Sequence, residues 1–392
     1  MIFSLLLFFL TACSHSLRPL YDQERAESLK TITSAPDKDW APDIRLSIAY
    51  RALSNLTQQL LEQKISKGNL PVDIFGQKLN VRLLSDIKSL NLSAGKDNVI
   101  KFLITLDGSV ELKHSLLNLS NPFSAKLNGT LEIDVDKNKL QIKANHIEDI
   151  QITTKNIPQL KINTVIKDWL NNNLSSLPSQ EIMTLELSNL SSRAIRFTGN
   201  RHSLDIEALS FFPQTSPLPP QKKHPRGDWE MRISNSALSQ IIRQQTFALP
   251  PVKNHHIDIS QIAIEGKVLK SKLRLWKLDG KGDWWRDYEI EAKITTEDKE
   301  ILLTNPKAKQ LAKSPGAGLA DPISLFGEKV ILNEITKQIK YKLPKEKSAS
   351  ISDNQLLLNI TGIMGQQEHI SMFGTIDSAK EKKKPRRRRR NK

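Results

Sequence analysis

Apolar and polar residues alternate with two different periods along this chain, and the period changes at equivalent places in its two halves. Residues 43–48 alternate in steps of two, as in a strand with one buried face, and residues 228–233 repeat this alternation. Apolar residues three or four apart follow at once, beginning at Ala52-Leu53-Ser54 and at Ala237-Leu238-Ser239. That spacing is typical of an amphipathic helix. Because the two openings align without a gap, we predict an internal repeat.

Longer alternating stretches follow each opening, and the turn-like Lys137-Asn138 between two of them favours antiparallel hairpins. They lie at residues 100–106, 125–135 and 140–144 in the first half and at residues 257–264 and 288–294 in the second. A second amphipathic helix is then expected at residues 162–170 and again at residues 331–339, each ending near a Leu-Pro pair. Closing strands complete both halves. The pattern predicts an α+β fold of two tandem repeats, each a long curved antiparallel sheet wrapped around an amphipathic helix.

Proline-rich and polar stretches divide the chain. Five prolines between residues 211 and 227 exclude a regular element there and predict a linker. The predicted organisation is a signal peptide at 1–12, a lipidated cysteine and tether at 13–42, domain 1 at 43–210, the linker at 211–227, domain 2 at 228–378, and a disordered basic tail at 379–392.

The first thirteen residues resemble a bacterial lipoprotein signal. An uncharged apolar run ends at Leu10-Thr11-Ala12-Cys13, which is similar to a lipobox, and it is too short to cross a bilayer as a helix. The resemblance implies that Cys13 is acylated and that the body lies at the periplasmic face of a membrane in the bacterial cell envelope. Ser14 favours the outer membrane. The alternative is a buried strand or helix with a chance cysteine.

Little in the sequence points to catalysis. Cys13 is the only cysteine, which leaves no thiol for a disulfide, a metal site or a nucleophile, and no nucleophile elbow, zinc helix or phosphate loop is present. His255-His256 alternate at a strand start, so their side chains are expected on opposite faces, as a solvated pair. Trp284-Trp285 suit either a membrane interface or a half-buried hairpin end. We predict no enzyme, no cofactor and no metal.

The charge of the chain is concentrated at its C-terminus. The formal net charge is +16, and residues 380–392 alone contain ten Lys or Arg and one Glu. Such a run repels itself and does not fold. We expect it to contact anionic headgroups or lipopolysaccharide, with nucleic acid disfavoured behind an export signal. The predicted contact residues are Lys382, Lys383, Lys384, Arg386, Arg387, Arg388, Arg389 and Arg390.

The order of elements across residues 43–378 resembles the tubular lipid-binding (TULIP) superfamily, whose members related to bactericidal/permeability-increasing protein join two such units. The resemblance rests on pattern and carries over no individual residue. It implies apolar grooves between helix and sheet that bind or transfer lipid. From the alternation, the expected groove lining is Leu53, Leu56, Phe102, Ile104, Leu127, Leu131, Ile133, Leu140, Ile142, Leu238, Ile241, Ile259 and Ile290. The alternatives are a trough filled by its own side chains and an envelope scaffold that contacts other proteins.

Overall fold

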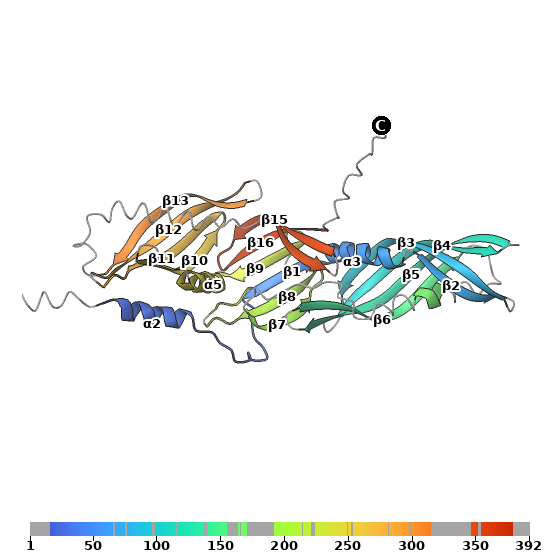
Figure 1. Cartoon of the computed structure of the whole chain (residues 1–392), viewed down its shortest axis with the longest axis horizontal. Coiled ribbons are helices and arrows are strands. Elements are labelled where there is room, and N and C mark those ends of the chain that lie inside the picture. Colours follow the sequence, from blue (N-terminus) through green and yellow to red (C-terminus); the bar gives the residue numbers. More distant parts are fainter. Residues whose placement is uncertain are drawn as a thin grey trace, which may run out of the picture.

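The computed structural model describes residues 16–154, 164–170, 192–314 and 346–378, apart from short gaps at 66, 75–76, 96–98, 115–116, 137–138, 165, 214, 221–223, 249, 252–253, 281, 298–299 and 352–353. Within these residues the strands form three open, curved antiparallel sheets (Figure 1). Two of them flank a third, which we call the central sheet.

The central sheet combines strands from both halves of the chain. Its order is β14-β15-β16-β9-β1-β8-β7, with β1 at Ile44–Ala49, β7 at Ser192–Gly199, β8 at Ser203–Ser210, β9 at Trp229–Ser234, β14 at Glu346–Ile351, β15 at Asn354–Gly365 and β16 at His369–Ser378. The opening strands of the two repeats, β1 and β9, lie side by side and antiparallel. Nothing in the sequence pattern indicated that the two repeats would share one sheet.

Each flanking sheet packs on one helix. The first unit consists of α3 (Tyr50–Ile65) and five strands in chain order, β2 (Lys67–Ile74), β3 (Gln77–Ala94), β4 (Val99–His114), β5 (Leu117–Asp136) and β6 (Lys139–Thr154). The second unit consists of α5 (Asn235–Ala248) and β10 (His255–Glu265), β11 (Val268–Lys277), β12 (Trp284–Glu297) and β13 (Glu300–Lys313). The predicted α+β fold of two curved sheets with amphipathic helices is confirmed.

Hydrogen bonds show the internal repeat directly. Ala49 N donates to the carbonyl of Asp228 at 2.9 Å, and Ser234 N donates to the carbonyl of Asp43 at 2.9 Å. The two bonds are equivalent by the repeat, because Asp43 aligns with Asp228 and Ala49 with Ser234. In each bond, the residue that ends one opening strand donates to the residue that precedes the other. The repeats are therefore related by an approximate two-fold axis that passes between β1 and β9.

The serine of the repeated Ala-Leu-Ser segment has the same structural role in each unit. Ser54 Oγ donates to the carbonyl of Tyr50 at 2.8 Å and accepts the amide of Leu92 on β3 at 3.0 Å. Ser239 Oγ, its equivalent on α5, accepts the amide of Ile262 on β10 at 2.8 Å. Each serine thus joins the first turn of its helix to a strand that would otherwise leave a buried N–H without an acceptor.

Two glycines occupy the joints between the central sheet and the flanking units. A Cβ added at Gly365 would overlap the carbonyl oxygen of Ile264 in the second unit. Gly199, at the corresponding joint of the first unit, approaches Ala94 and Tyr50, at 3.3 and 3.0 Å from an added Cβ. The close approach of backbones at Gly365 requires a residue without a side chain.

One face of the central sheet buries charged side chains under the proline-rich linker. Arg45 Nη2 lies 2.6 Å from Glu207 Oε1, and Arg45 Nη1 donates to the carbonyl of Pro219 at 3.0 Å. Further along, the amide of Arg226 donates to Glu230 Oε2 at 3.2 Å. The described part of the linker forms no helix or strand. It lies across this polar face, where it completes hydrogen bonds that the strands leave open.

The N-terminal segment differs from the prediction. We expected an irregular tether at residues 13–42, but Arg18–Ser28 form helix α2, in which Tyr21 is buried. Pro19 lies at the start of the helix, where a missing N–H costs nothing. Only Tyr21 and Ser28 are buried along the helix, so no apolar period was visible in the sequence.

Several sequence predictions lie outside the described residues. These are the signal peptide with Cys13, the basic tail from residue 379 onward, and the helix expected at residues 331–339. Of the helix expected at 162–170, residues 166–170 are helical, and Ile166, Trp169 and Leu170 are buried in the core of the first unit.

Replacing either serine of the repeated Ala-Leu-Ser segment is expected to destabilise the fold. Ser54→Ala leaves the buried amide of Leu92 without an acceptor, and Ser239→Ala does the same to Ile262. Each substitution should lower the free energy of unfolding by about 1–3 kcal/mol in urea titrations. Ser93→Ala, at an exposed position of β3, is the matched control and should have almost no effect. Equal effects at Ser54 and Ser93 would contradict the assigned role.

Acid is expected to destabilise the protein through His369. This side chain is buried, both ring nitrogens lack a partner among the described residues, and burial lowers its pKa below 6.5, with Arg232 adding to the effect. As the pH falls through about 6.5, the unfolded chain takes up a proton that the folded chain does not, so stability is lost. In thermal unfolding, Tm of the wild-type protein should fall more between pH 7 and 5 than Tm of His369→Gln. The same fall in both proteins would show that His369 does not carry this dependence.

Candidate functional site

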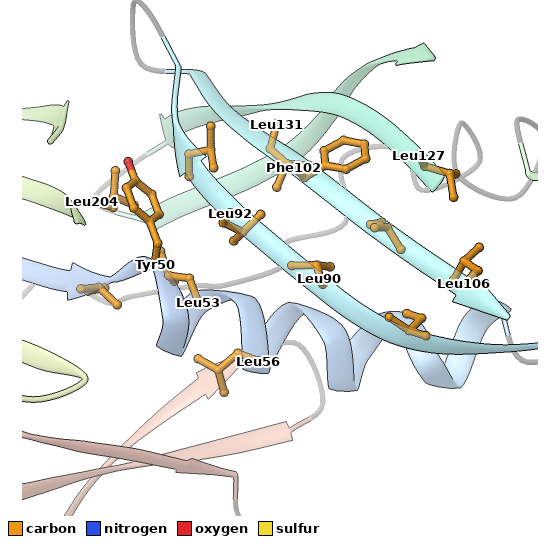
Figure 2. Close-up of a cluster of buried hydrophobic side chains, with 14 of the residues drawn as sticks. Tyr50, Leu53, Leu56, Leu90, Leu92, Phe102, Leu106, Leu127, Leu131 and Leu204 are labelled. Atoms are coloured by element: carbon orange, nitrogen blue, oxygen red, sulfur yellow. The ribbon is translucent and has the colours of Figure 1, made fainter. Parts of the chain in front are cut away.

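The inner face of the first unit is one continuous apolar surface. Alternate residues of its strands point toward α3 and are buried, while the residues between them are mostly polar and face solvent. Figure 2 shows Leu90, Leu92, Phe102 and Leu106 on neighbouring strands facing the helix. Among the described strand residues that face α3, the buried polar side chains are Ser85 and Asn121, and no charged side chain is buried.

The helix that covers this face is much shorter than the strands beneath it. With 16 residues α3 is about 24 Å long, whereas the 20 residues of β5 span about 66 Å. Tyr50, Leu53 and Leu56 are the described helix residues that enter the cluster. Residues 166–170 supply a second helical cover through Trp169 and its neighbours. Among the described residues, the apolar face is therefore covered by α3 and by residues 166–170.

Most of the groove residues predicted for the first unit come together. Leu53, Leu56, Phe102, Ile104, Leu127 and Leu131 belong to a single buried cluster. Ile133, Leu140 and Ile142 lie on β5 and β6, and their side chains are outside the description. All six described residues are at most 8% exposed, so they pack against one another and against the helices.

The pattern missed the contribution of β3. Val81, Leu83, Leu90 and Leu92 of this strand are as deeply buried as the predicted residues. The pairing of β3 with β4 shifts register between Ile87 and Ser89, and this bulge moves the apolar positions from odd to even numbers. The reversal of phase hides the alternation from any search for a constant period of two. The signal is present only when the strand is divided at the bulge.

The second unit repeats the arrangement with a smaller cluster. Ile259 and Ile290, both predicted, are buried there, and Leu238 of α5 packs against them. Ile241 is half-buried, and its neighbour Ile242 is the α5 residue that packs against the cluster. Leu238 and Ile242 are four residues apart and therefore lie on the same side of α5, which is the side that faces the sheet.

The edge strand of the second unit leaves part of the inner face exposed. Ala308 and Gln310 on β13 pair with Ile290 and Tyr288 on β12, so they share the inner face. All residues from 305 to 313 are nevertheless exposed, whereas Ile290 and Tyr288 are buried. Among the described residues, the inner face is therefore buried as far as β12 and borders solvent along β13.

In each of the pairs His255-His256 and Trp284-Trp285, the two side chains lie on opposite faces of the second unit. His256 and Tyr21 are joined by a hydrogen bond of 3.0 Å between Nδ1 and Oη, and burial lowers the pKa of His256. The expected solvated pair is therefore wrong for His256. Trp284 is buried in the inner cluster, and Trp285 lies on the outer face under the guanidinium of Arg274, 4.2 Å from its ring centre.

Among the described residues there is no group of three or more His, Cys, Asp or Glu side chains that could hold a metal ion. No described helix combines the length and the apolar character needed to span a membrane.

Comparisons with known proteins give structural neighbours only. No protein-family model and no curated protein matches the chain. The crystal structure of lipopolysaccharide binding protein matches with a TM-score of 0.38 and 11% identity, over 86% of this chain and 99% of that one. P47 from Clostridium botulinum A2 matches with a TM-score of 0.37 and 14% identity, over 85% and 97%. P47 of Clostridium botulinum E1 gives 0.39 and 13%, over 86% and 100%. These neighbours have BPI/TULIP-like folds.

Proposed function

We propose that this chain is a lipid-binding lipoprotein of the bacterial cell envelope, anchored through Cys13 at the periplasmic face of a membrane. The observation that carries the proposal is the pair of long apolar sheet faces, each packed against a helix that is shorter than its strands or does not reach its edge strand, so that the face of the second unit is bordered by solvent along β13. A face of this kind suits an acyl chain, which is long, apolar and about as wide as a side chain.

The energetics favour uptake of an acyl chain. Each CH₂ removed from water contributes about 0.8 kcal/mol, so a chain of about sixteen carbons gains roughly 12 kcal/mol before costs. The inner side chains already pack against one another, so entry requires α5 or its neighbours to move outward. The apolar surface that this movement exposes is covered again by the entering chain. The free energy of opening is therefore smaller than the free energy gained by burying the chain.

We place the entry of lipid at the β13 edge of the second unit. Ala308 is small and exposed, and the neighbouring inner residue on β12, Ile290, is among the first buried side chains behind it. An acyl chain that enters there meets a short exposed strip and then the apolar side chains of the inner cluster. One buried charged side chain, Arg286, lies on the same face of β12, opposite Leu275 on β11, with its guanidinium 4.8 Å from the ring centre of Trp284.

The anchor and the tail belong to the same proposal. Acylation at Cys13 would hold the protein at the membrane, with the outer membrane favoured by Ser14. The basic residues 382–390 would contact anionic headgroups or lipopolysaccharide, at about 1 kcal/mol for each Lys or Arg near a charged surface. The proposed function involves no catalysis and no cofactor.

Lipid retention tests this proposal. The body, expressed without residues 1–13 and purified without detergent, is expected to carry phospholipid or lipopolysaccharide that mass spectrometry detects in extracts. Ile290→Trp fills the interior behind β13 and should reduce the bound lipid several-fold, as should Phe102→Trp for any lipid in the first unit. Glu291→Trp and Leu103→Trp, at exposed positions beside them, are the matched controls and should retain lipid.

Two results would contradict the proposal. A wild-type body without lipid, together with a stable protein partner in cross-linking, would favour the scaffold alternative. Equal lipid content in Ile290→Trp and Glu291→Trp, with both proteins folded by circular dichroism, would remove the second-unit entry.

A further inference from the structure

The chain is pinned to the second unit immediately after its N-terminal segment. Ser16 Oγ and Leu17 N both donate to Asp283 Oδ2, at 3.1 and 3.0 Å. The other oxygen of the same carboxylate accepts the amide of Gly280 at 2.8 Å. Asp283 therefore links the N-terminal segment to the turn between β11 and β12, residues 278–283.

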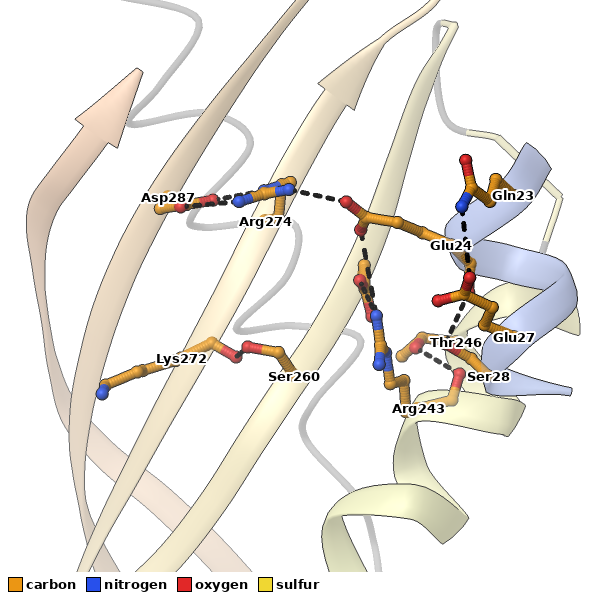
Figure 3. A network of polar contacts seen from close by, with 11 residues as sticks. Gln23, Glu24, Glu27, Ser28, Arg243, Thr246, Ser260, Lys272, Arg274 and Asp287 are labelled. Carbon is orange, nitrogen blue, oxygen red and sulfur yellow. Dashed lines mark hydrogen bonds and ion pairs between the residues drawn. The ribbon is translucent and has the colours of Figure 1, made fainter. Parts of the chain in front are cut away.

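Helix α2 continues this attachment along the outer face of the second unit. The ring of Tyr21 packs between Phe247 and Trp276 and is 2% exposed. Three residues further on, Glu24 accepts from Arg274 at 2.9 Å and lies 3.9 Å from Arg243 (Figure 3). The contacts combine aromatic packing with ion pairs that are partly removed from water, so α2 is a docked element and not a loose leader.

This docking fixes how far an anchor at Cys13 can lie from the body. Ser16 is three positions after Cys13, and an extended chain spans at most about 3.6 Å per position, which gives about 11 Å. If residues 13–42 were free, the same rule would give about 100 Å. The attachment of α2 thus removes nearly all of the freedom that an unstructured tether would have.

We infer that the end of the second unit formed by the turn 278–283 and the start of α2 is the surface that rests on the lipid headgroups of the anchoring membrane. The inference rests on the proposed anchor at Cys13. Arg18 and Leu20 are exposed at the start of α2, and Trp285 lies on this outer face. A cation, an exposed apolar side chain and an indole together are the residue types that settle at a membrane interface.

The same geometry directs the first unit away from the membrane. Figure 1 shows α2 beside the second unit at one end of the long axis and the five-stranded sheet at the other. Strand β4 begins near the central sheet, where Val99 adjoins the turn that follows β3. Glu111 lies twelve positions further along β4, about 40 Å away, and it pairs with Ser120 on β5. Ser120 therefore marks the end of the molecule farthest from the inferred membrane surface.

The test uses the full mature chain coupled through Cys13, its only thiol, to a maleimide lipid in phosphatidylethanolamine–phosphatidylglycerol vesicles that contain an acceptor-labelled lipid. A fluorescent non-natural amino acid replaces Asp279 in one sample and Ser120 in the other. We expect strong energy transfer from position 279 and several-fold weaker transfer from position 120. Equal transfer from both positions would overturn the inference.

Release of α2 supplies the second arm. Tyr21→Ala combined with Asp283→Ala should lower the transfer from position 279 toward that from position 120, because residues 13–42 become a long tether. Asp107→Ala, which removes an exposed acidic acceptor on the first unit, is the matched control and should change neither value. Unchanged transfer in the double variant would show that α2 does not set the orientation.

The anchor is tested separately by the mass of the N-terminal peptide isolated from cells. An unmodified Cys13 would contradict the proposed function, whereas the transfer measurement, in which the anchor is supplied chemically, still decides whether the body holds the turn against a bilayer.

Discussion

The pairing of β1 with β9 is the interaction on which the rest of this structure depends. Each of these six-residue strands opens one repeat and lies in the middle of the shared central sheet, with a partner strand on both sides. The reciprocal bonds between Ala49 and Asp228 and between Ser234 and Asp43 require the two strands to be antiparallel and in one register. A slip by one residue would turn the apolar side of β1 toward the linker and the charged side into the core.

The same register gives the central sheet one apolar buried face and one charged buried face. On one face of the central sheet, Leu46 and Ile48 continue the apolar core of the first unit. On the other, Arg45 and Glu207 form an ion pair that the linker covers. A buried ion pair contributes little net stability, but breaking it is costly, so it selects this arrangement over alternatives. The linker thus completes the fold of the central sheet as well as connecting the repeats.

The apolar faces that we regard as the candidate site follow from the same arrangement. Helices α3 and α5 start directly after β1 and β9 and are fixed at that end by Ser54 and Ser239. Each helix is therefore tied to its flanking sheet close to the central sheet. At β13, which is farthest in sheet order from the strand that Ser239 contacts, the inner face is exposed. The proposed entry of lipid lies at the place where the fold holds its helix least.

The sequence by itself determined the local features: the repeat, the change of period from strand to helix at Ala-Leu-Ser, the irregular linker, and the buried side of β4, β5 and β10. These features are encoded by near neighbours, whose spacing decides which face is apolar. Only the tertiary structure decided that β1 pairs with β9, that a bulge reverses the phase of β3, and that Tyr21 and Glu24 dock α2 some 220 to 260 residues away in sequence. Such contacts depend on pairs of residues distant along the chain, and one or two buried side chains in a short helix leave no period to detect. The same limit applies to the candidate site, since alternation identified its lining but not which strand would remain uncovered.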